Sequence, residues 1–312
     1  MKTAFLFPGQ GSQYVGMGTA LKAAHPVAAE VFEEADDALG FGLSDLILNG
    51  PLETLTQTEN NQPAILTTSV AYLRVLEANG FTPDITAGHS LGEYSALVAA
   101  GALSFVDAIR LVRLRGRCMQ AAVPLGEGTM SAILRLDDEI VERLCAETLG
   151  LGVVEPAGYN AVGQVAIAGA VAAVAAVEAK VEEAGGVAKR LNVSAPFHCS
   201  MLSKAGEELA AALTEVTFKP LAIPYVANVD AEIITDSDRI ASRLVDQVMK
   251  PVRWVQTIKQ IIGFGTERYL EVGPGRTLFG LQRRIDRKAK VVCVDKEGVL
   301  DALLNEEAQG AQ

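Results

Sequence analysis

The sequence predicts an α/β protein in which a small α+β segment interrupts a larger domain. Three observations support this prediction. The 312 residues are 49% hydrophobic but only 5% aromatic, which suits helices and buried strands packed with small side chains better than an all-β sandwich. Short apolar runs that end in glycine-containing loops alternate with helical patterns. From about residue 126 the elements become shorter.

The totals exclude several classes of protein. A formal net charge of −11 argues against nucleic-acid binding, which normally requires a basic excess. The four cysteines lie far apart, without the paired spacing of a zinc site or a redox dithiol, so we expect no metal and no disulfide. No stretch approaches the roughly 20 apolar residues that span a bilayer, and the N-terminal apolar run is too short for a signal peptide. We therefore expect a cytoplasmic protein.

The chain begins with a strand pattern over residues 3–7 that ends in the loop Pro8-Gly9-Gln10-Gly11. Loops at strand ends of α/β sheets are common ligand sites, and glycines allow the backbone to approach a ligand closely. Gln10 is therefore a candidate binding residue. A tight turn with a solvated glutamine would give the same pattern.

Helical patterns cover most of the larger domain. Proline is favoured at a first helical position, so Pro63 predicts the start of a long helix. Ser104 is a suitable N-cap for another helix. The predicted helices span about residues 17–39, 41–48, 64–78, 91–100, 105–121, 207–214, 237–250, 252–262 and 278–285.

A serine between two glycines marks a candidate nucleophile. Residues 85–88 predict a strand, Ser90 follows, and a helix begins at Leu91. This order is typical of the nucleophile elbow of α/β hydrolases, where glycines flank the serine because Cβ atoms would clash at the sharp turn. The helix start offers unsatisfied N–H groups, that of Leu91 first, to an oxyanion. We therefore expect residues 1–125 and 194–312 to form an α/β-hydrolase-like domain with a parallel sheet.

Residues 126–193 are predicted to form a small ferredoxin-like subdomain inserted into that larger domain. Alternating short strands and helices are typical of a compact α+β unit. The predicted strands span 129–134, 165–169 and 187–191, and the predicted helices span 137–149 and 171–184.

One arginine lies on the apolar side of its predicted helix. Three other arginines of residues 105–121 share one stripe, whereas Arg115 lies among Ala, Leu, Val, Cys and Met side chains on the opposite stripe. Burying a guanidinium is costly unless it meets an anion. We therefore expect Arg115 either to pair with an internal Asp or Glu or to hold the carboxylate of a substrate in a bidentate contact.

The chain contains three histidines that could act as a base for Ser90. His25 lies at a helix end, and His89 adjoins Ser90, so its side chain should point away from the serine hydroxyl. His198 is the best remaining candidate. A lone histidine in a loop is more often structural, but the serine turn upstream favours a catalytic role.

Six short segments of the chain are specific for one protein family when they are taken together and in this order. They are Phe7-Pro8-Gly9-Gln10-Gly11-Ser12-Gln13, Gly88-His89-Ser90-Leu91-Gly92-Glu93-Tyr94, Leu114-Arg115-Gly116, Gly163-Gln164-Val165-Ala166-Ile167-Ala168-Gly169, Ala195-Pro196-Phe197-His198 and Glu271-Val272-Gly273-Pro274-Gly275. Each alone is a weak signal. Together they span nearly the whole chain. Through them the chain resembles the malonyl-CoA:acyl carrier protein transacylases, the stand-alone acyltransferases of bacterial fatty acid synthesis.

The resemblance implies ping-pong transfer of malonyl from malonyl-CoA to the pantetheine thiol of acyl carrier protein, through a malonyl-Ser90 intermediate. It implies His198 as the base and Arg115 as the group that holds the malonyl carboxylate. Backbone N–H groups of Gln10 and Leu91 would form the oxyanion hole. No bound cofactor is expected beyond these substrates.

The resemblance also describes the surroundings of these groups. The backbone carbonyl of Gln247 is expected to orient His198 in place of an aspartate. We expect Met119, Asn160 and Phe197 to line the acyl pocket, and the bulk of Phe197 favours malonyl over methylmalonyl.

The expected partners are malonyl-CoA, CoA and acyl carrier protein, with no nucleic acid and no membrane, and we expect a monomer. Acyl carrier proteins are acidic, and this chain is acidic too, so docking requires a local basic patch. The densest basic run contains Arg276, Arg283, Arg284 and Arg287. A solvated helix face would give the same pattern.

Two other functions fit the serine turn. A serine hydrolase would use water as the acceptor and a carboxylate partner for His198. A catalytically idle binding module would keep the fold without forming an acyl-serine. The sequence also leaves both fatty acid and polyketide synthesis open as the pathway.

Overall fold

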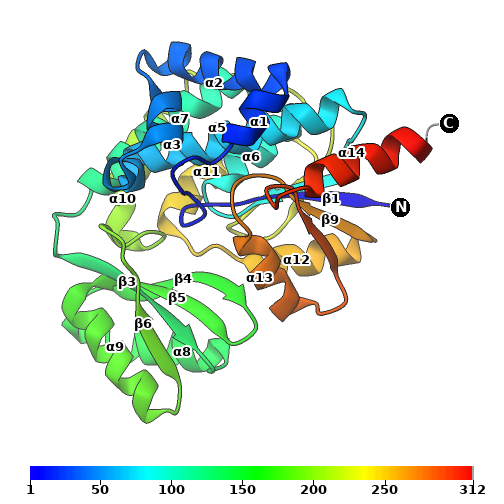
Figure 1. Ribbon diagram of the computed structural model, residues 1–312. Coiled ribbons are helices and arrows are strands. Elements are labelled where there is room, and N and C mark those ends of the chain that lie inside the picture. Colours follow the sequence, from blue (N-terminus) through cyan, green and yellow to red (C-terminus); the bar gives the residue numbers. More distant parts are fainter. Residues whose placement is uncertain (311–312) are drawn as a thin grey trace.

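This computed structural model describes residues 1–310, and side chains as far as residue 306. Two sheets organise this mixed α/β protein. A six-stranded, mainly parallel sheet lies in the larger part, and a four-stranded antiparallel sheet lies in the smaller part (Figure 1). Over residues 1–310, no helix is long and apolar enough to cross a membrane.

The larger sheet is buried on both faces. Its strands are β1 (Thr3–Phe7), β2 (Ile85–Gly88), β7 (Tyr225–Val226), β8 (Ile233–Ile234), β9 (Arg268–Glu271) and β10 (Lys290–Cys293). The order is β10-β9-β1-β2-β7-β8; the β7–β8 pair is antiparallel and the other pairs are parallel. Because side chains alternate along a strand, Phe5 and Phe7 join one hydrophobic core while Ala4 and Leu6 join another.

Helices cover both faces of this sheet (Figure 1). They are α1 (Thr19–Ala24), α2 (Pro26–Leu39), α3 (Leu43–Asn49), α4 (Leu52–Thr56), α5 (Thr58–Ala78), α6 (Gly92–Ala99), α7 (Phe105–Ala121), α10 (Ser203–Leu213), α11 (Ile240–Met249), α12 (Trp254–Gly263), α13 (Thr277–Ile285) and α14 (Val299–Gly310). Helices α12 and α13 pack on the Ala4 and Leu6 face, and α1–α7, α10, α11 and α14 contribute to the opposite core. Parallel strands sandwiched in this way place their carboxyl-end loops together, where a site can form.

The helical pattern over residues 17–39 is divided in the structure at His25, where a helix end was expected. The chain forms α1 and α2, separated by His25, which is extended at φ −128° and ψ 111°. The cause is Pro26, because a proline ring disfavours the helical conformation at the residue that precedes it.

The predicted start of the long helix near residue 64 is wrong. Helix α5 begins at Thr58 and contains Pro63 in its interior. Proline has no N–H, so the Glu59 carbonyl loses its helical donor. Arg113 Nη1 on α7 donates to that oxygen at 2.9 Å, which compensates for the loss and fastens α5 to α7.

Residues 126–193 contain the second sheet. Its elements are β3 (Gly128–Leu134), α8 (Asp138–Ala146), β4 (Val154–Ala161), β5 (Gln164–Ala170), α9 (Val171–Glu183) and β6 (Val187–Arg190). The strand order is β4-β5-β3-β6, and each neighbouring pair is antiparallel. Along β5, Val165 and Ile167 pack under α8 and α9, whereas Ala166 and Ala168 join the core of the larger part. The alanine face therefore lies toward the larger part of the molecule (Figure 1).

Strand β4 was missing from the prediction. It contains Pro156 and Gly158, which are unfavourable in strand interiors, but it is an edge strand with irregular pairing at both residues, where such residues are tolerated. Its free edge meets the segment before α12: Tyr159 N donates to Val252 O at 2.8 Å, and Val252 N donates to Ala157 O at 3.0 Å. These bonds join the small sheet to the larger part.

Candidate active site

Ser90 lies at the turn between β2 and α6, with a positive φ of 53°. The two glycines beside it are sterically required. A Cβ on Gly88 would lie 1.9 Å from Gly92 C, and a Cβ on Gly92 would lie 2.1 Å from Phe7 O. This crowding holds the turn against β1 and leaves the serine in a conformation that L-residues rarely adopt.

His198 meets Ser90 across 108 residues of sequence. Its Nε2 lies 2.7 Å from Ser90 Oγ, and its Nδ1 lies 2.6 Å from the backbone carbonyl oxygen of Gln247. A carbonyl oxygen only accepts, so Nδ1 carries the hydrogen and the Nε2 lone pair faces the serine hydroxyl. His198 also has a positive φ, 62°. The arrangement is that of a serine with a base already in place.

The environment keeps His198 neutral. Burial lowers the pKa of its imidazole to about 3, and the positive charge of Arg115 acts in the same direction. The hydrogen bond to Gln247 O opposes the shift but does not reverse it. The free imidazole is therefore the form present near neutral pH, which is the form that can accept a proton.

Arg115 is 2% exposed and lies beside the reactive pair. Its Nη1 donates to Gln62 Oε1 at 2.8 Å, and its Nη2 donates to Gln247 Oε1 at 2.8 Å and to Ser90 Oγ at 3.2 Å. Within the part of the chain that the structure describes, no Asp or Glu forms an ion pair with it. Burial accordingly lowers the pKa of this guanidinium. The first alternative from the sequence, an internal acidic partner, is not what the structure contains.

The two amides expected to form an oxyanion hole belong to the serine turn and to the loop after β1. Leu91 precedes the first residue of α6, and Gln10 follows β1 in the neighbouring loop. Neither amide nitrogen donates a hydrogen bond to another described group. Gly9 fixes the approach of the two loops, since a Cβ there would lie 2.4 Å from His89 O. Both N–H groups remain available to a ligand.

A cavity of about 180 Å³ lies at the serine and histidine. All three residues expected to line the pocket do so, and the small sheet supplies much of the opposite wall. A larger cavity of about 640 Å³ adjoins it, because Gln10 and Val193 line both. The inner cavity is lined by Gln10, Gln62, His89, Ser90, Arg115, Met119, Met130, Ala157, Gly158, Asn160, Ala166, Leu191, Val193, Phe197 and His198.

Three polar residues of this site were missed from the sequence. Asn228 Oδ1 accepts from Ser90 N at 2.7 Å, and its Nδ2 donates to Gly88 O at 2.7 Å, so it braces the serine turn. Glu93 and Gln62 are buried at 0% and 1% exposure. The available signal was position: Glu93 follows the serine by three residues in a helix of otherwise mostly apolar or small residues.

The predicted docking arginines do not line either cavity. They are exposed on α13 and the segments that flank it. The guanidinium groups of Arg276 and Arg283 lie 5.2 and 5.7 Å from the centre of the Phe279 ring, and Arg284 Nη1 donates to Gln164 Oε1 of the small sheet at 2.7 Å. In residues 1–306, no group of three or more His, Cys, Asp and Glu side chains could hold a metal ion.

The sheet, the serine turn and the buried histidine fit acyl-transfer chemistry. A family model described as "Acyl transferase domain" matches residues 4–291, so the chain is an acyltransferase. A malonyl CoA-acyl carrier protein transacylase of Bacillus subtilis is 45% identical over 297 residues, covering 94% of this chain and 93% of its own. The chain belongs to the malonyl CoA-acyl carrier protein transacylase family.

Solved structures agree with this assignment. An acyl carrier protein S-malonyltransferase from Vibrio cholerae is 44% identical with a TM-score of 0.95, over 97% of this chain and 100% of that one. A malonyl-transacylase solved in complex with its type II polyketide synthase acyl carrier protein is 43% identical with a TM-score of 0.95, over 98% of this chain and 100% of that one.

Proposed function

We propose that this chain transfers the malonyl group of malonyl-CoA to the pantetheine thiol of holo-acyl carrier protein, by a ping-pong mechanism through a malonyl-serine. The observation that carries the choice of acyl group is Arg115, a buried cation without an acidic partner among the described residues, 3.2 Å from Ser90 Oγ. An acyl group with its own carboxylate supplies the missing counter-charge. The named relatives are malonyl CoA-acyl carrier protein transacylases, which supports the same choice.

The first half-reaction begins at the Ser90 hydroxyl. His198 Nε2 removes the proton as Oγ attacks the thioester carbonyl carbon, and the carbon–oxygen double bond becomes an oxyanion. The amides of Gln10 and Leu91 stabilise that oxyanion. As the intermediate collapses, the carbon–sulfur bond breaks, the imidazolium returns its proton to the sulfur, and CoA leaves the malonyl-serine behind.

The second half-reaction reverses these steps with a different thiol. The pantetheine thiol gives its proton to His198 and attacks the ester of malonyl-Ser90, and the serine leaves with that proton. We place the pantetheine arm in the larger cavity, because it adjoins the inner cavity at Gln10 and Val193. No cofactor or metal takes part in this proposal, since exchange between thioester and ester involves no redox step and Ser90, His198 and the two thiols account for every proton.

Gln247 takes the place of a triad carboxylate in this proposal. Its carbonyl oxygen, 2.6 Å from His198 Nδ1, holds the imidazole in the tautomer that the reaction requires. A carbonyl stabilises the imidazolium less than a carboxylate would. The proton accepted from Ser90 is therefore returned readily to the leaving thiol.

Two side chains select the acyl group. Arg115 favours malonyl over acetyl, since an acetyl group leaves the guanidinium unpaired at a cost of roughly 2–5 kcal/mol. Phe197 lines the small inner cavity next to His198, and we propose that its bulk excludes the extra methyl group of methylmalonyl.

The partner in this proposal is an acyl carrier protein. One structural relative is described as a complex with a type II polyketide synthase acyl carrier protein. We propose that acyl carrier protein docks on this chain through Arg276, Arg283, Arg284 and Arg287, which are exposed and opposite in charge to an acidic partner. Fatty acid and polyketide synthesis consume the same product.

We also propose a finer description of the architecture. Residues 1–125 and 194–312 would form an α/β-hydrolase-like catalytic domain, a reading supported by the parallel strands and the serine turn between β2 and α6. Residues 126–193 would form a ferredoxin-like subdomain, supported by the element order β-α-β-β-α-β and its antiparallel sheet. We propose a cytoplasmic monomer; four free, buried cysteines agree with a reducing compartment.

Intact-mass measurement after incubation with malonyl-CoA tests the function. The protein should gain one malonyl group that disappears on addition of holo-acyl carrier protein, which should gain it in turn. Ser90→Ala should abolish the adduct. A serine hydrolase would instead release malonate without carrier protein, and an idle binding module would show no adduct; either result overturns the proposal.

A further inference from the structure

Gln247 contacts three groups of the reaction at once. Its backbone oxygen accepts from His198, its side-chain Oε1 accepts from Arg115 Nη2 at 2.8 Å, and its Nε2 donates to Ser90 O at 2.8 Å. A side-chain amide can serve the last two only in one orientation. After a 180° flip its NH₂ would face the Arg115 donors and its oxygen would face the serine carbonyl.

Glu93 fixes that orientation. Its Oε2 accepts from Gln247 Nε2 at 2.7 Å and from Asn228 N at 3.3 Å, and the residue is 0% exposed. A carboxyl oxygen at this position requires the NH₂ end of the amide. The amide oxygen of Gln247 is thereby directed at Arg115. Glu93 touches none of the reacting atoms itself and acts through Gln247.

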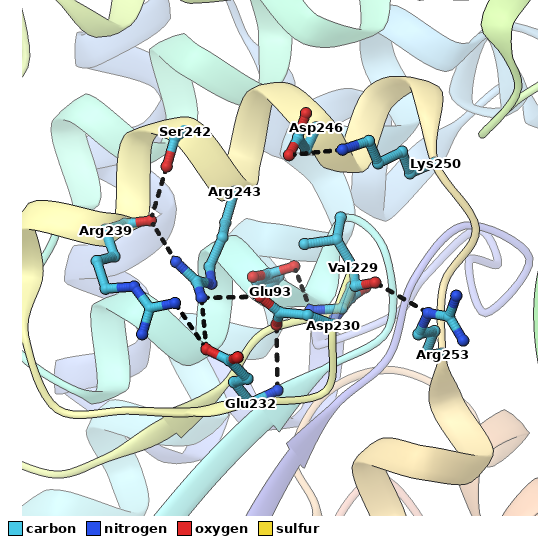
Figure 2. A network of polar contacts seen from close by, with 11 residues as sticks. Glu93, Val229, Asp230, Glu232, Arg239, Ser242, Arg243, Asp246, Lys250 and Arg253 are labelled. Atoms are coloured by element: carbon cyan, nitrogen blue, oxygen red, sulfur yellow. Dashed lines mark hydrogen bonds and ion pairs between the residues drawn. The ribbon is translucent and has the colours of Figure 1, made fainter.

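The charges that face Glu93 come from several elements. Arg115 lies on α7, and Asp230 lies in the loop before β8. Tyr94 and Tyr225 are buried phenols nearby, and the charge of Arg243 on α11 acts on Tyr225. Figure 2 shows that Arg243 is already engaged by acidic groups: its Nη2 binds Asp230 Oδ2 at 2.8 Å and Glu232 Oε2 at 2.7 Å.

Burial raises the pKa of Glu93 to about 8, and the negative charge of Asp230 acts in the same direction. The hydrogen bonds from Gln247 and Asn228 and the charge of Arg115 oppose the shift. Glu93 Oε1 makes no hydrogen bond to a described residue, so it can carry the proton while Oε2 continues to accept from Gln247. Below pH 8 the carboxyl is mostly neutral.

We propose that Glu93 is a positioning residue for malonyl transfer: it orients the Gln247 amide against Arg115 and leaves the guanidinium charge for the malonyl carboxylate. The inference rests on the proposed function. Its consequence is a linkage between pH and substrate binding. When Glu93 ionises, its charge opposes the malonyl carboxylate in a site with little water.

The linkage makes malonyl binding weaker at high pH. Below about pH 8 Glu93 is neutral, and a bound malonyl group neutralises Arg115 without competition. Above that pH the added negative charge weakens malonyl binding. The malonyl-CoA concentration that gives half the maximal rate of malonyl-Ser90 formation should therefore rise between pH 7 and pH 9.5, by at least about fivefold if the coupling is typical of charged sites.

The test measures malonyl-Ser90 formation by quenched intact mass, without carrier protein, for the wild type and two variants across pH 7–9.5. Glu93→Gln keeps an acceptor for Gln247 but cannot ionise, so its half-saturating malonyl-CoA concentration should stay level with pH. Glu93→Leu has a similar size but no acceptor, so it should form the adduct more slowly than Glu93→Gln at every pH. A pH rise in Glu93→Gln equal to that of the wild type would overturn the proposal, as would equal rates for the two variants.

Glu271→Gln is the matched control. Glu271 is also 0% exposed and has a raised pKa through burial, but it accepts from the amides of Leu278 and Phe279 at the start of α13, away from the cavity. This variant should lower the melting temperature and keep the wild-type pH profile. If wild-type protein gains no malonyl adduct, the proposed function fails; if it gains the adduct and Glu93→Gln keeps the wild-type profile, only the role of Glu93 fails.

Discussion

Two arginines of this chain are almost equally buried, yet their surroundings differ in one respect. Arg115 is 2% exposed and contacts the amide oxygens of two glutamines and a serine hydroxyl, whereas Arg243 is 7% exposed and binds the carboxylates of Asp230 and Glu232 (Figure 2). The fold neutralises Arg243 by itself. It gives Arg115 no carboxylate partner among the described residues, and we propose that this difference distinguishes a structural cation from a binding cation.

The position of Arg243 explains what its ion pairs hold together. It lies on α11, four residues before Gln247, and its two partners lie in the loop that follows Asn228. The pairs therefore fasten the helix that supports His198 to the loop that braces the serine turn. Arg115 also joins helices, α7 to α5 and α11, but only through the neutral amide oxygens of Gln62 and Gln247.

The sharpest test of the comparison removes each cation in turn. Arg115→Ala should lower kcat/KM for malonyl transfer by about 30- to 4000-fold, corresponding to roughly 2–5 kcal/mol, and should favour acetyl transfer over malonyl. The reason is that the malonyl carboxylate would enter a dry site without a partner. Steady-state rates with malonyl-CoA and acetyl-CoA measure this, and unchanged malonyl kinetics would remove Arg115 from the site.

Arg243→Ala should mainly lower stability rather than activity. It leaves Asp230 and Glu232 without their cation, and because both keep contact with water the loss of unfolding free energy should be about 2–3 kcal/mol. Denaturant unfolding measures the loss. Transfer per folded molecule should fall far less than in Arg115→Ala; a larger fall in activity than in stability would contradict the structural role.

A pH series separates the two cations in another way. His198 has its pKa lowered to about 3 by burial first and by Arg115 second, so adduct formation should stay level from pH 7.5 to pH 5. An imidazole with the ordinary pKa near 6.5 would be mostly protonated at pH 5 and would lose about 30-fold in rate. In Arg115→Ala the histidine pKa should rise and the acidic limb should move to higher pH, whereas Arg243→Ala should leave it in place.

The same histidine links pH to stability. Because its folded-state pKa is below the unfolded value, the unfolded chain takes up the proton first, so this group adds stability above pH 6.5 that is lost progressively as the pH falls toward 3.

Exposed arginines should give the smallest effect. Arg283→Glu with Arg284→Glu should raise the KM for acyl carrier protein several-fold, by reversing a charge that attracts an acidic partner, and should leave the KM for malonyl-CoA unchanged. Steady-state kinetics with each substrate varied in turn decides this. Equal KM values for acyl carrier protein in wild type and variant would show that α13 is a solvated helix face without a docking role.

Much of this site could be predicted because it depends on the type and position of particular side chains. A serine between glycines locates the turn, three histidines leave one suitable base, and an arginine on an apolar stripe indicates a buried cation. The role of the Gln247 carbonyl could not be derived from its side chain, because every residue has a carbonyl; only the family resemblance indicated it. The contact of Glu93 with Gln247 joins positions 154 residues apart, which no local pattern specifies.

The fold shows the same division between local and long-range information. Helix α7 and its Ser104 cap were predicted to the residue, since periodicity and capping are local. Strand β4 and the start of α5 were not, because each depends on a distant partner. Pro63 is tolerated in a helix since Arg113 satisfies the Glu59 carbonyl, and Pro156 is tolerated in a strand at the edge of its sheet.

The left-handed backbone at Ser90 and His198 has a consequence for the evolution and engineering of this enzyme. At φ 53° and φ 62°, glycine would relieve strain at both positions, so the substitutions that the backbone favours are those that remove the proposed nucleophile and the proposed base. At these two positions, a substitution by glycine would therefore raise thermal stability and abolish activity. Substitutions that stabilise the protein and keep its activity must therefore lie at other positions of the chain.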